Sequence, residues 1–139
     1  MFSEGERDLA PCPCGEKAAY GQCCKRYHLG FPAENALKLM RSRYSAYALG
    51  NADYIIATTH PDHVERGKPL SKWKSEIESF SKQSRFLSLK VQSFQDGEDT
   101  ATVSFSAALE QNKRHTTLRE KSLFKKVAGR WLYLSGELK

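Results

Sequence analysis

All four cysteines of the chain lie in one stretch of thirteen residues, where they form two close pairs. Cys12 and Cys14 flank a single proline, eight residues follow, and Cys23 then adjoins Cys24. Neither pair closes a disulfide within itself without strain, so only bridges between the pairs are feasible. A segment of about twenty residues with so little apolar content cannot order itself by burial, whereas Zn²⁺ held by thiolates supplies on the order of 10 to 16 kcal/mol. The pattern therefore predicts a zinc site with Cys12, Cys14, Cys23 and Cys24 as ligands.

Other interpretations of the cysteines stay open at this level. They include bridges between the pairs or inert buried thiols, although a reducing compartment disfavours disulfides. An iron centre would use the same sulfurs, and His28, four residues beyond Cys24, is an alternative ligand. Four thiolates around Zn²⁺ leave no position for water, so we expect a structural ion. Basic side chains near enough to offset its negative charge are Lys17, Lys25 and Arg26.

The net charge of +6 is unevenly distributed along the 139 residues. The first thirty residues contain four basic and four acidic side chains, so the excess belongs to the remainder. It is concentrated between Arg66 and Lys90 and between Lys113 and Arg130. An anionic partner such as RNA or a ribosome surface is compatible with these stretches. Support for nucleic acid is weak, because the chain has neither a recognition helix with zinc-finger spacing nor an aromatic ribonucleoprotein motif.

Membrane and secretory signals are absent from the sequence. No apolar run approaches the roughly 18 residues that a membrane span requires. Residues 1–11 contain charged side chains where a secretory signal would be apolar, namely Glu4, Glu6, Arg7 and Asp8. We therefore expect a cytoplasmic protein that does not associate with a membrane.

The rest of the chain has the pattern of one α+β domain. Apolar residues first recur with helical spacing, as in the stripe Leu37, Met40, Tyr44, Tyr47 and Ala48. The expected helices are residues 34–49, 52–58 and 70–80. The period then changes to two, and the expected strands are residues 87–91, 101–107, 117–127 and 131–135. Helices followed by an antiparallel meander indicate an α+β fold.

A family resemblance strengthens these expectations. The cysteine segment resembles the SEC-C motif, a small zinc-binding element also found at the tail of the SecA translocation motor, through Cys12-Pro-Cys14-Gly15, Tyr20 and Cys23-Cys24. Together with residues 39–47, 52–54, 60–61 and 129–133, it makes nearly the whole chain similar to the bacterial YchJ family. The resemblance implies a SEC-C element in residues 1–31 and a cone-like domain similar to nuclear transport factor 2 (NTF2) in residues 32–139. The function of the family is unassigned, and we expect the SEC-C element to bind an unidentified protein partner.

The chain departs from the family pattern in two places. Many members carry a second SEC-C copy at the carboxyl end, whereas this sequence stops at Lys139 without further cysteines. Residues 120–124 read Glu-Lys-Ser-Leu-Phe where Glu-Arg-Ser-Arg-Phe is more usual, so Leu123 removes a charge. These departures put in doubt any activity that needs paired zinc elements.

A set of polar and aromatic residues is the candidate lining of a pocket in the cone. Its members are Arg41, Arg43, Tyr44, Tyr47, Asp53, Tyr54, His60, Glu120 and Trp131. In the first interpretation Arg41 and Arg43 are structural, extending from the edge of the core or pairing with carboxylates such as Asp53 or Glu120. In the second, guanidinium and phenol groups meet at the mouth of a cavity and bind a small anionic or planar ligand.

Catalysis is the competing function class. Related cone folds host enzymes with an acid/base set in the cavity, which here would be Asp53 or His60 as base and Tyr54 as donor. A structural use of the same residues is the commoner one, since Asp53 suits a helix start and His60 precedes a proline at a helix end. Ser45 has no glycine-rich elbow, and no phosphate-binding glycine loop is present, so hydrolysis gains no support. We assign no catalytic residue.

Overall fold

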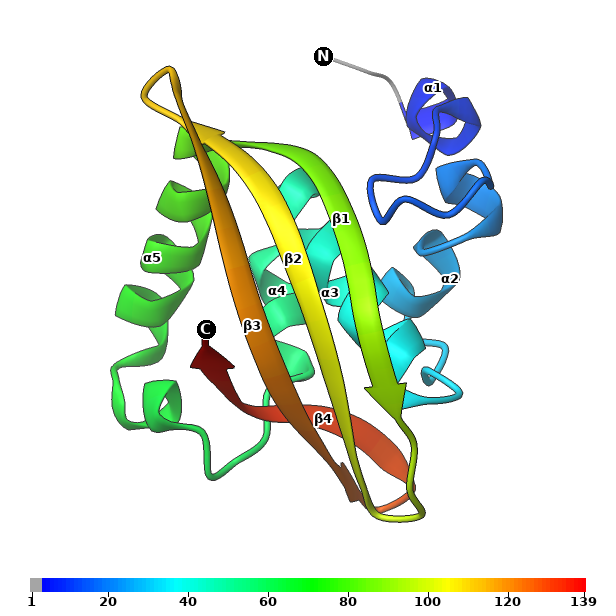
Figure 1. The fold of residues 1–139 in the computed structure, drawn as a ribbon, viewed down its shortest axis with the longest axis vertical. Coiled ribbons are helices and arrows are strands. Elements are labelled where there is room, and N and C mark those ends of the chain that lie inside the picture. Colours follow the sequence, from blue (N-terminus) through cyan, green and yellow to red (C-terminus); the bar gives the residue numbers. More distant parts are fainter. Residues whose placement is uncertain (1–3) are drawn as a thin grey trace.

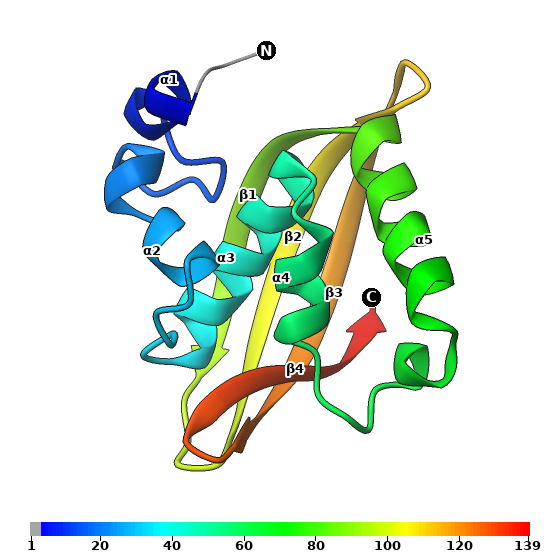
Figure 2. The same cartoon turned by 180° about the vertical axis from the view of Figure 1, so that it is seen from behind.

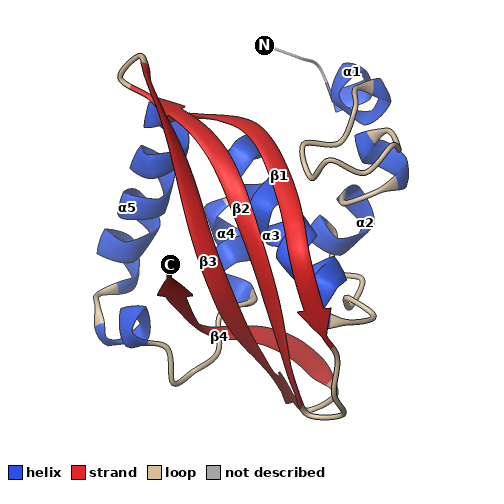
Figure 3. Cartoon of the chain, in the orientation of Figure 1, coloured by secondary structure: helices blue, strands red, loops and turns tan. Residues whose placement is uncertain are grey.

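A computed structural model describes residues 4–139 as a curved antiparallel sheet with helices on one face (Figures 1 and 3). Residues 1–3, the start of the segment searched for a secretory signal, lie outside the described part. The strands form a meander in the order β1-β2-β3-β4. Their bounds are Ser84–Gln95, Thr100–Gln111, Arg114–Val127 and Arg130–Leu138. The helices α3 (Ala36–Leu49), α4 (Ala52–Ala57) and α5 (Leu70–Gln83) cover the concave face, as Figure 2 shows from behind.

Local chemistry explains the ends of the long helix α3. The side chain of Asn35 caps its start by accepting a hydrogen bond from the Lys38 amide at 2.8 Å. Gly50 ends it with φ of 75°, a left-handed conformation that favours glycine. The helix therefore begins two residues later than expected, because Asn35 serves as the cap and not as part of the helix.

The apolar stripe expected on α3 is buried only in part, at Met40 and Tyr44. Leu37, Tyr47 and Ala48 from the expected stripe are only partly buried. By contrast, Ser42 and Ser45 are fully enclosed. The reason is that α3 has two neighbours: the sheet packs on one side of it, and the cysteine-containing segment packs on another.

Turn chemistry determines the register of the meander. Asn112 and Lys113 join β2 to β3 with φ of 54° and 64°, and Ala128 and Gly129 join β3 to β4 with φ of 51° and 79°. Two consecutive residues at positive φ are the signature of a tight hairpin turn whose twist matches that of the strands. Irregularities in the β1–β2 pairing, near Phe86 and Val91, add curvature to the sheet. All four strands are longer than the sequence pattern predicts.

The core lies between the sheet and α3. Its buried members are Ala36, Leu39, Met40, Ala101, Val103, Phe124 and Trp131. A second cluster joins α3 and α4 to α5 through Ala46, Ala52, Ile55, Trp73 and Ile77. The segment after α4 pairs with β4, since the His60 amide donates to the Tyr133 carbonyl at 2.8 Å. None of the helices in residues 4–139 is long and apolar enough to cross a membrane.

The segment before α3 is compact and contains short helices that periodicity does not reveal. These are α1 (Glu4–Leu9), the 3-10 turn η1 (Tyr20–Gln22) and α2 (Lys25–His28); a further 3-10 turn, η2 (Val64–Gly67), follows α4. In Figures 1 and 2 the first three lie beside α3 at the β1 side of the sheet, whereas α5 lies at the opposite side. The predicted boundary between residues 31 and 32 falls in the connection between α2 and α3, and it stays a prediction.

Candidate metal centre

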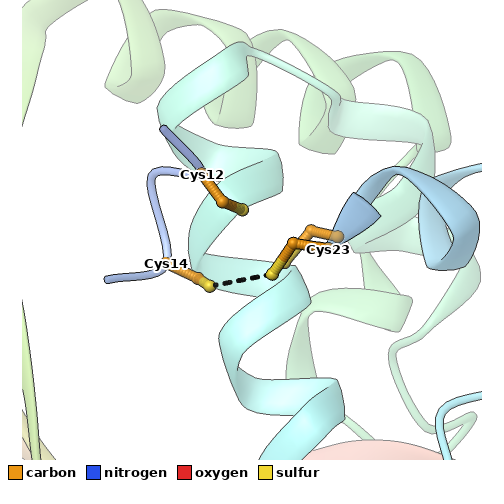
Figure 4. A group of neighbouring side chains, drawn as sticks. Cys12, Cys14 and Cys23 are labelled. Atoms are coloured by element: carbon orange, nitrogen blue, oxygen red, sulfur yellow. Dashed lines mark hydrogen bonds between the residues drawn. The ribbon is translucent and has the colours of Figure 1, made fainter. Parts of the chain in front are cut away.

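The four cysteine sulfurs converge on one point. All of them lie within 4.8 Å of one another, and Sγ of Cys14 is 3.6 Å from Sγ of Cys23. Figure 4 shows the side chains of Cys12, Cys14 and Cys23 directed toward one another. A regular tetrahedron with zinc–sulfur bonds of about 2.3 Å has edges of about 3.8 Å. All four thiols are free, so the cluster is a set of metal donors and not a disulfide.

Two short pieces of backbone hold the sulfurs in place. Before the first pair, Pro11 bridges to Ala19, and the Cys12 amide donates to the Ala18 carbonyl at 3.0 Å. After Cys14 the chain turns at Gly15 with φ of 88°, a conformation that a residue with a side chain adopts only with strain. The second pair lies where η1 passes into α2.

Electrostatics favours a cation among the sulfurs. The neighbouring thiol of Cys14 lowers the pKa of Cys12 by hydrogen bonding, whereas contact with Cys12 raises the pKa of both Cys14 and Cys24. Burial raises the pKa of Cys23 to about 12. One sulfur therefore ionises at the expense of the others, because adjacent negative charges repel. A divalent cation removes this conflict and stabilises all four thiolates, so the donor set fits a metal ion.

Ser45 on α3 is a contact of this cluster that the sequence analysis missed. Its hydroxyl donates to Sγ of Cys24 at 3.3 Å and lies 3.4 Å from Sγ of Cys12. The sequence offered no signal for this contact, because the full burial of Ser45 becomes visible only in the structure. Such outer contacts orient metal ligands and tune their basicity.

Arg41 belongs to the cysteine segment and not to a pocket in the cone. Its Nη1 donates to the Cys14 carbonyl at 2.8 Å, and its Nε forms an ion pair with Glu16 at 3.2 Å. The placement of Arg41 in the pocket set is thus corrected, because the cysteine segment covers the side of α3 from which Arg41 projects. A hollow of about 160 Å³ beside the sulfurs is also lined by Arg26 and Lys38, together with the carboxylate of Glu16.

His28 is placed as a structural residue and not as a ligand. Its Nε2 lies 2.8 Å from the Ser42 carbonyl and its Nδ1 lies 2.7 Å from the Tyr20 hydroxyl, so both ring nitrogens are engaged. Burial lowers the pKa of His28 and keeps the ring neutral. It donates to the carbonyl through Nε2 and accepts from the phenol through Nδ1. Tyr20, one of the residues of the SEC-C pattern, is itself buried.

The structure divides the remaining candidate pocket residues into two groups. Arg43, Tyr44, Tyr47 and Glu120 line one cavity of about 400 Å³ between the helices and the sheet. Asp53, Tyr54, His60 and Trp131 do not line it. The family resemblance named these residues together, but the fold brings only the first group to a common space.

The acid/base set does not assemble in the cavity. Asp53 has an exposed side chain that pairs with Lys74 at 3.0 Å. The Tyr54 hydroxyl bonds Ser42 Oγ at 2.7 Å, and His60 Nδ1 accepts from the Asp62 amide at 3.0 Å.

Asp53, Tyr54 and His60 thus make three separate structural contacts. Trp131 packs in the core beneath Lys126, whose Nζ lies 5.0 Å from the ring centre. Cavity residues that the sequence analysis missed are His63, Ser122 and Tyr133.

Comparison with known proteins agrees with both parts of the molecule. The family described as YchJ, middle NTF2-like domain, matches residues 35–136. A UPF0225 protein of Bordetella parapertussis is 42% identical over 134 residues, covering 94% of each chain. The solution structure of a SEC-C motif containing protein from Rhodopseudomonas palustris aligns with a TM-score of 0.80 and 32% identity, covering 91% of this chain and 96% of that one. A SEC-C motif containing protein from Psychrobacter arcticus has a TM-score of 0.80 at 25% identity, covering 96% and 85% respectively.

Proposed function

Since the chain belongs to the YchJ family, we propose that it is a structural zinc protein whose metal-bound segment forms a binding surface for another protein. The observation that carries the proposal is the convergence of four free sulfurs within 4.8 Å. Zinc is the ion that best suits four thiolates in a closed tetrahedral site. The proposal includes the cytoplasm as the compartment, because its reducing conditions keep the thiols available.

The role of the ion is to hold residues 4–31 against α3. Three of the contacts that attach this segment to α3 lie at or near the cysteine loops: Arg41 to the Cys14 carbonyl, Ser45 to Cys24, and His28 to the Ser42 carbonyl. Without the ion, four crowded sulfurs in a weakly apolar segment lose the free energy that orders them. We therefore expect metal loss to unfold the segment first, and the domain of residues 36–138 to a smaller extent.

Metal analysis of the native protein tests the zinc site. Protein purified without added metal should contain one Zn²⁺ per chain, and Cys14→Ser and Cys23→Ser should contain less. An exposed substitution such as Ser88→Ala is the matched control and should retain the ion. Iron in place of zinc, or four titratable thiols in metal-free protein with an unchanged melting temperature, would overturn the proposal.

The binding surface follows from apolar side chains that the segment leaves exposed. Leu29 is 76% exposed and Phe31 is 53% exposed, immediately after α2. The guanidinium of Arg26 lies over the Phe31 ring at 5.4 Å, which holds the ring at the surface. Exposed apolar groups beside a cation are typical of a surface that binds another protein. Arg26 is already paired with Glu34 at 3.1 Å, so the chemistry favours a partner segment with apolar side chains.

Crosslinking in cells tests the binding surface separately from the metal. A photoreactive residue placed at Pro32, which is exposed beside Phe31, should capture the same partner from metal-bound wild-type protein and from the control Leu87→Ser/Leu138→Ser, whose changes lie on the sheet. The double variant Leu29→Ser/Phe31→Ser should retain zinc and lose the partner. If the double variant and the zinc-depleted protein capture the same partner as wild type, the surface is not the one that binds.

A further inference from the structure

The cavity in the cone is a second site, distinct from the cysteine cluster. Its volume of about 400 Å³ lies in the range of small-molecule sites. Its walls come from α3, α5 and the concave face of the sheet, which Figure 2 shows from the helical side. Most of its lining is aromatic or aliphatic, as in Tyr47, Trp73, Ile77, Phe80, Phe86 and Phe105. Such walls suit a flat apolar molecule.

Arg43 places a positive charge on this cavity. The residue is only 7% exposed, and its guanidinium lies 4.5 Å from the centre of the Tyr133 ring. All its hydrogen bonds use Nη1, with acceptors at 2.8 to 3.2 Å on Ile55, Thr58 and Thr59. Its other two nitrogens donate to nothing in residues 4–139 and are not fully enclosed, and Arg43 is one of the residues that line the cavity. No carboxylate within 4.0 Å pairs with this cation among the described residues.

Glu120 places a negative charge on the same cavity. Its Oε2 accepts hydrogen bonds from the hydroxyls of Ser122 and Tyr133, the latter at 3.2 Å. Its Oε1 has no partner in the described part of the chain. Both hydroxyls donate to one oxygen, so the other oxygen of the carboxylate is available to a donor inside the cavity.

The charges of Arg43 and Glu120 are anchored apart, whereas the other charged residues of the lining, Glu65, Lys68 and Glu76, form ion pairs among themselves. Arg43 is held by backbone and hydroxyl oxygens near the end of α4, and Glu120 is held by β3 and β4. Tyr133 contacts both, with its ring under Arg43 and its hydroxyl on Glu120. Opposite charges attract, yet these anchors keep Arg43 and Glu120 from pairing. A molecule that carries a carboxylate and a hydrogen-bond donor can bind the Arg43 guanidinium and the Glu120 carboxylate at the same time.

We propose that the cavity binds a small aromatic molecule bearing a carboxylate and an amine, such as an aromatic amino acid. The carboxylate accepts from the open nitrogens of Arg43, and the amine donates to Oε1 of Glu120. The ring packs against the aromatic walls supplied by α5 and the sheet. This site is independent of the cysteine cluster and of the protein-binding surface proposed above.

Calorimetry with four probes that share an indole ring tests the assignment. L-tryptophan carries both charges, indolepropionate only the carboxylate, tryptamine only the ammonium, and methylindole neither. Loss of either charged contact should weaken binding by at least about tenfold, so L-tryptophan should bind most tightly and methylindole least. Equal affinity for the four probes, or no heat from any of them at millimolar concentration, would overturn the proposal.

Variants assign each charge to its residue. Glu120→Gln should weaken L-tryptophan and tryptamine by about tenfold and leave indolepropionate unchanged or tighter. Glu110→Gln is the matched control, because Glu110 lies on β2 in an exterior cluster with Arg85 and His115 and does not line the cavity. Ala107→Leu fills the cavity without touching either charge and should weaken every probe. A folded Glu120→Gln protein with wild-type preference among the probes would rule out the assigned role of Glu120.

Discussion

Ser45 donates its hydroxyl proton to Sγ of Cys24 across 3.3 Å, and this contact connects the long helix to the cysteine cluster. The two residues are separated by 21 positions in sequence. Because the serine is fully buried, no water replaces it. Helix α3, which packs against the sheet in the core, therefore also donates a hydrogen bond to the cysteines of the candidate metal centre.

Removal of this hydroxyl should weaken metal binding. Ser45→Ala takes away a donor to the thiolates, and loss of such an outer partner typically lowers affinity about 10- to 100-fold. Competition with a zinc chelator measures the effect. Ser104→Ala, on β2 and remote from the cluster, is the control. Unchanged competition in Ser45→Ala would show that the hydroxyl does not act on the ligands.

Arg41 should anchor the cysteine segment. Arg41→Ala removes the 2.8 Å bond to the Cys14 carbonyl and the ion pair with Glu16, so we expect a loss of about 1 to 3 kcal/mol in the free energy of unfolding. Hydrogen exchange at residues 12–24 should increase. Arg85→Ala breaks only an exposed ion pair with Glu110 and should cost less than about 1 kcal/mol. Equal effects of the two variants would contradict the anchoring role.

The partly buried His28 should make stability depend on pH. Burial lowers its pKa from the ordinary value of 6.5, so the folded state binds fewer protons than the unfolded state below that pH. The contribution of the neutral His28 ring to the free energy of unfolding is complete above pH 6.5. It is lost as the pH falls toward the lowered pKa of the folded state. Urea unfolding at saturating zinc should show a smaller decrease on acidification in His28→Gln. His115→Gln changes an exposed histidine and should keep the wild-type slope.

Gly136 should be needed for the contact between Tyr133 and Glu120. A Cβ at this position would lie 2.5 Å from Cδ of Glu120 and 2.5 Å from Oη of Tyr133, so the two side chains must separate. Gly136→Ala should then lose about 0.5 to 1.5 kcal/mol with the broken hydrogen bond. Gly67→Ala, where a Cβ meets nothing within 4 Å, is the control in urea unfolding. Equal free energies of unfolding for the two variants would show that the hydrogen bond between Tyr133 and Glu120 can be displaced without loss of stability.

Local patterns predicted most of the fold. The change from helical spacing to alternation places the boundary between α5 and the meander, and the turn residues separate the strands. The short helices α1 and α2 were missed because the ordering of this segment comes from its contacts with α3 and from the cysteine cluster, and not from periodic apolar side chains. The predicted strands were too short, since exposed positions at their ends still pair with their neighbours.

The cysteine cluster was predictable and its surroundings were not. Ligand spacing is a property of neighbouring residues, whereas the partners of Arg41 and Ser45 are 27 and 21 positions away. Arg43 and Arg41 are two residues apart, so they project to different sides of α3 and reach different sites. The partner of Glu120 depends on the β3–β4 register, which shifts by an irregularity at Leu123.

Helix α3 is enclosed from two directions, and the matched NTF2-like region begins at residue 35, after the segment that covers one of them. A chain shortened to that region would expose the side of α3 that carries Arg41 and Ser45, together with apolar neighbours that water does not normally reach. Such a fragment is expected to aggregate or to bind another molecule through the exposed side of α3. Studies of the cone in isolation should therefore retain the first thirty-four residues.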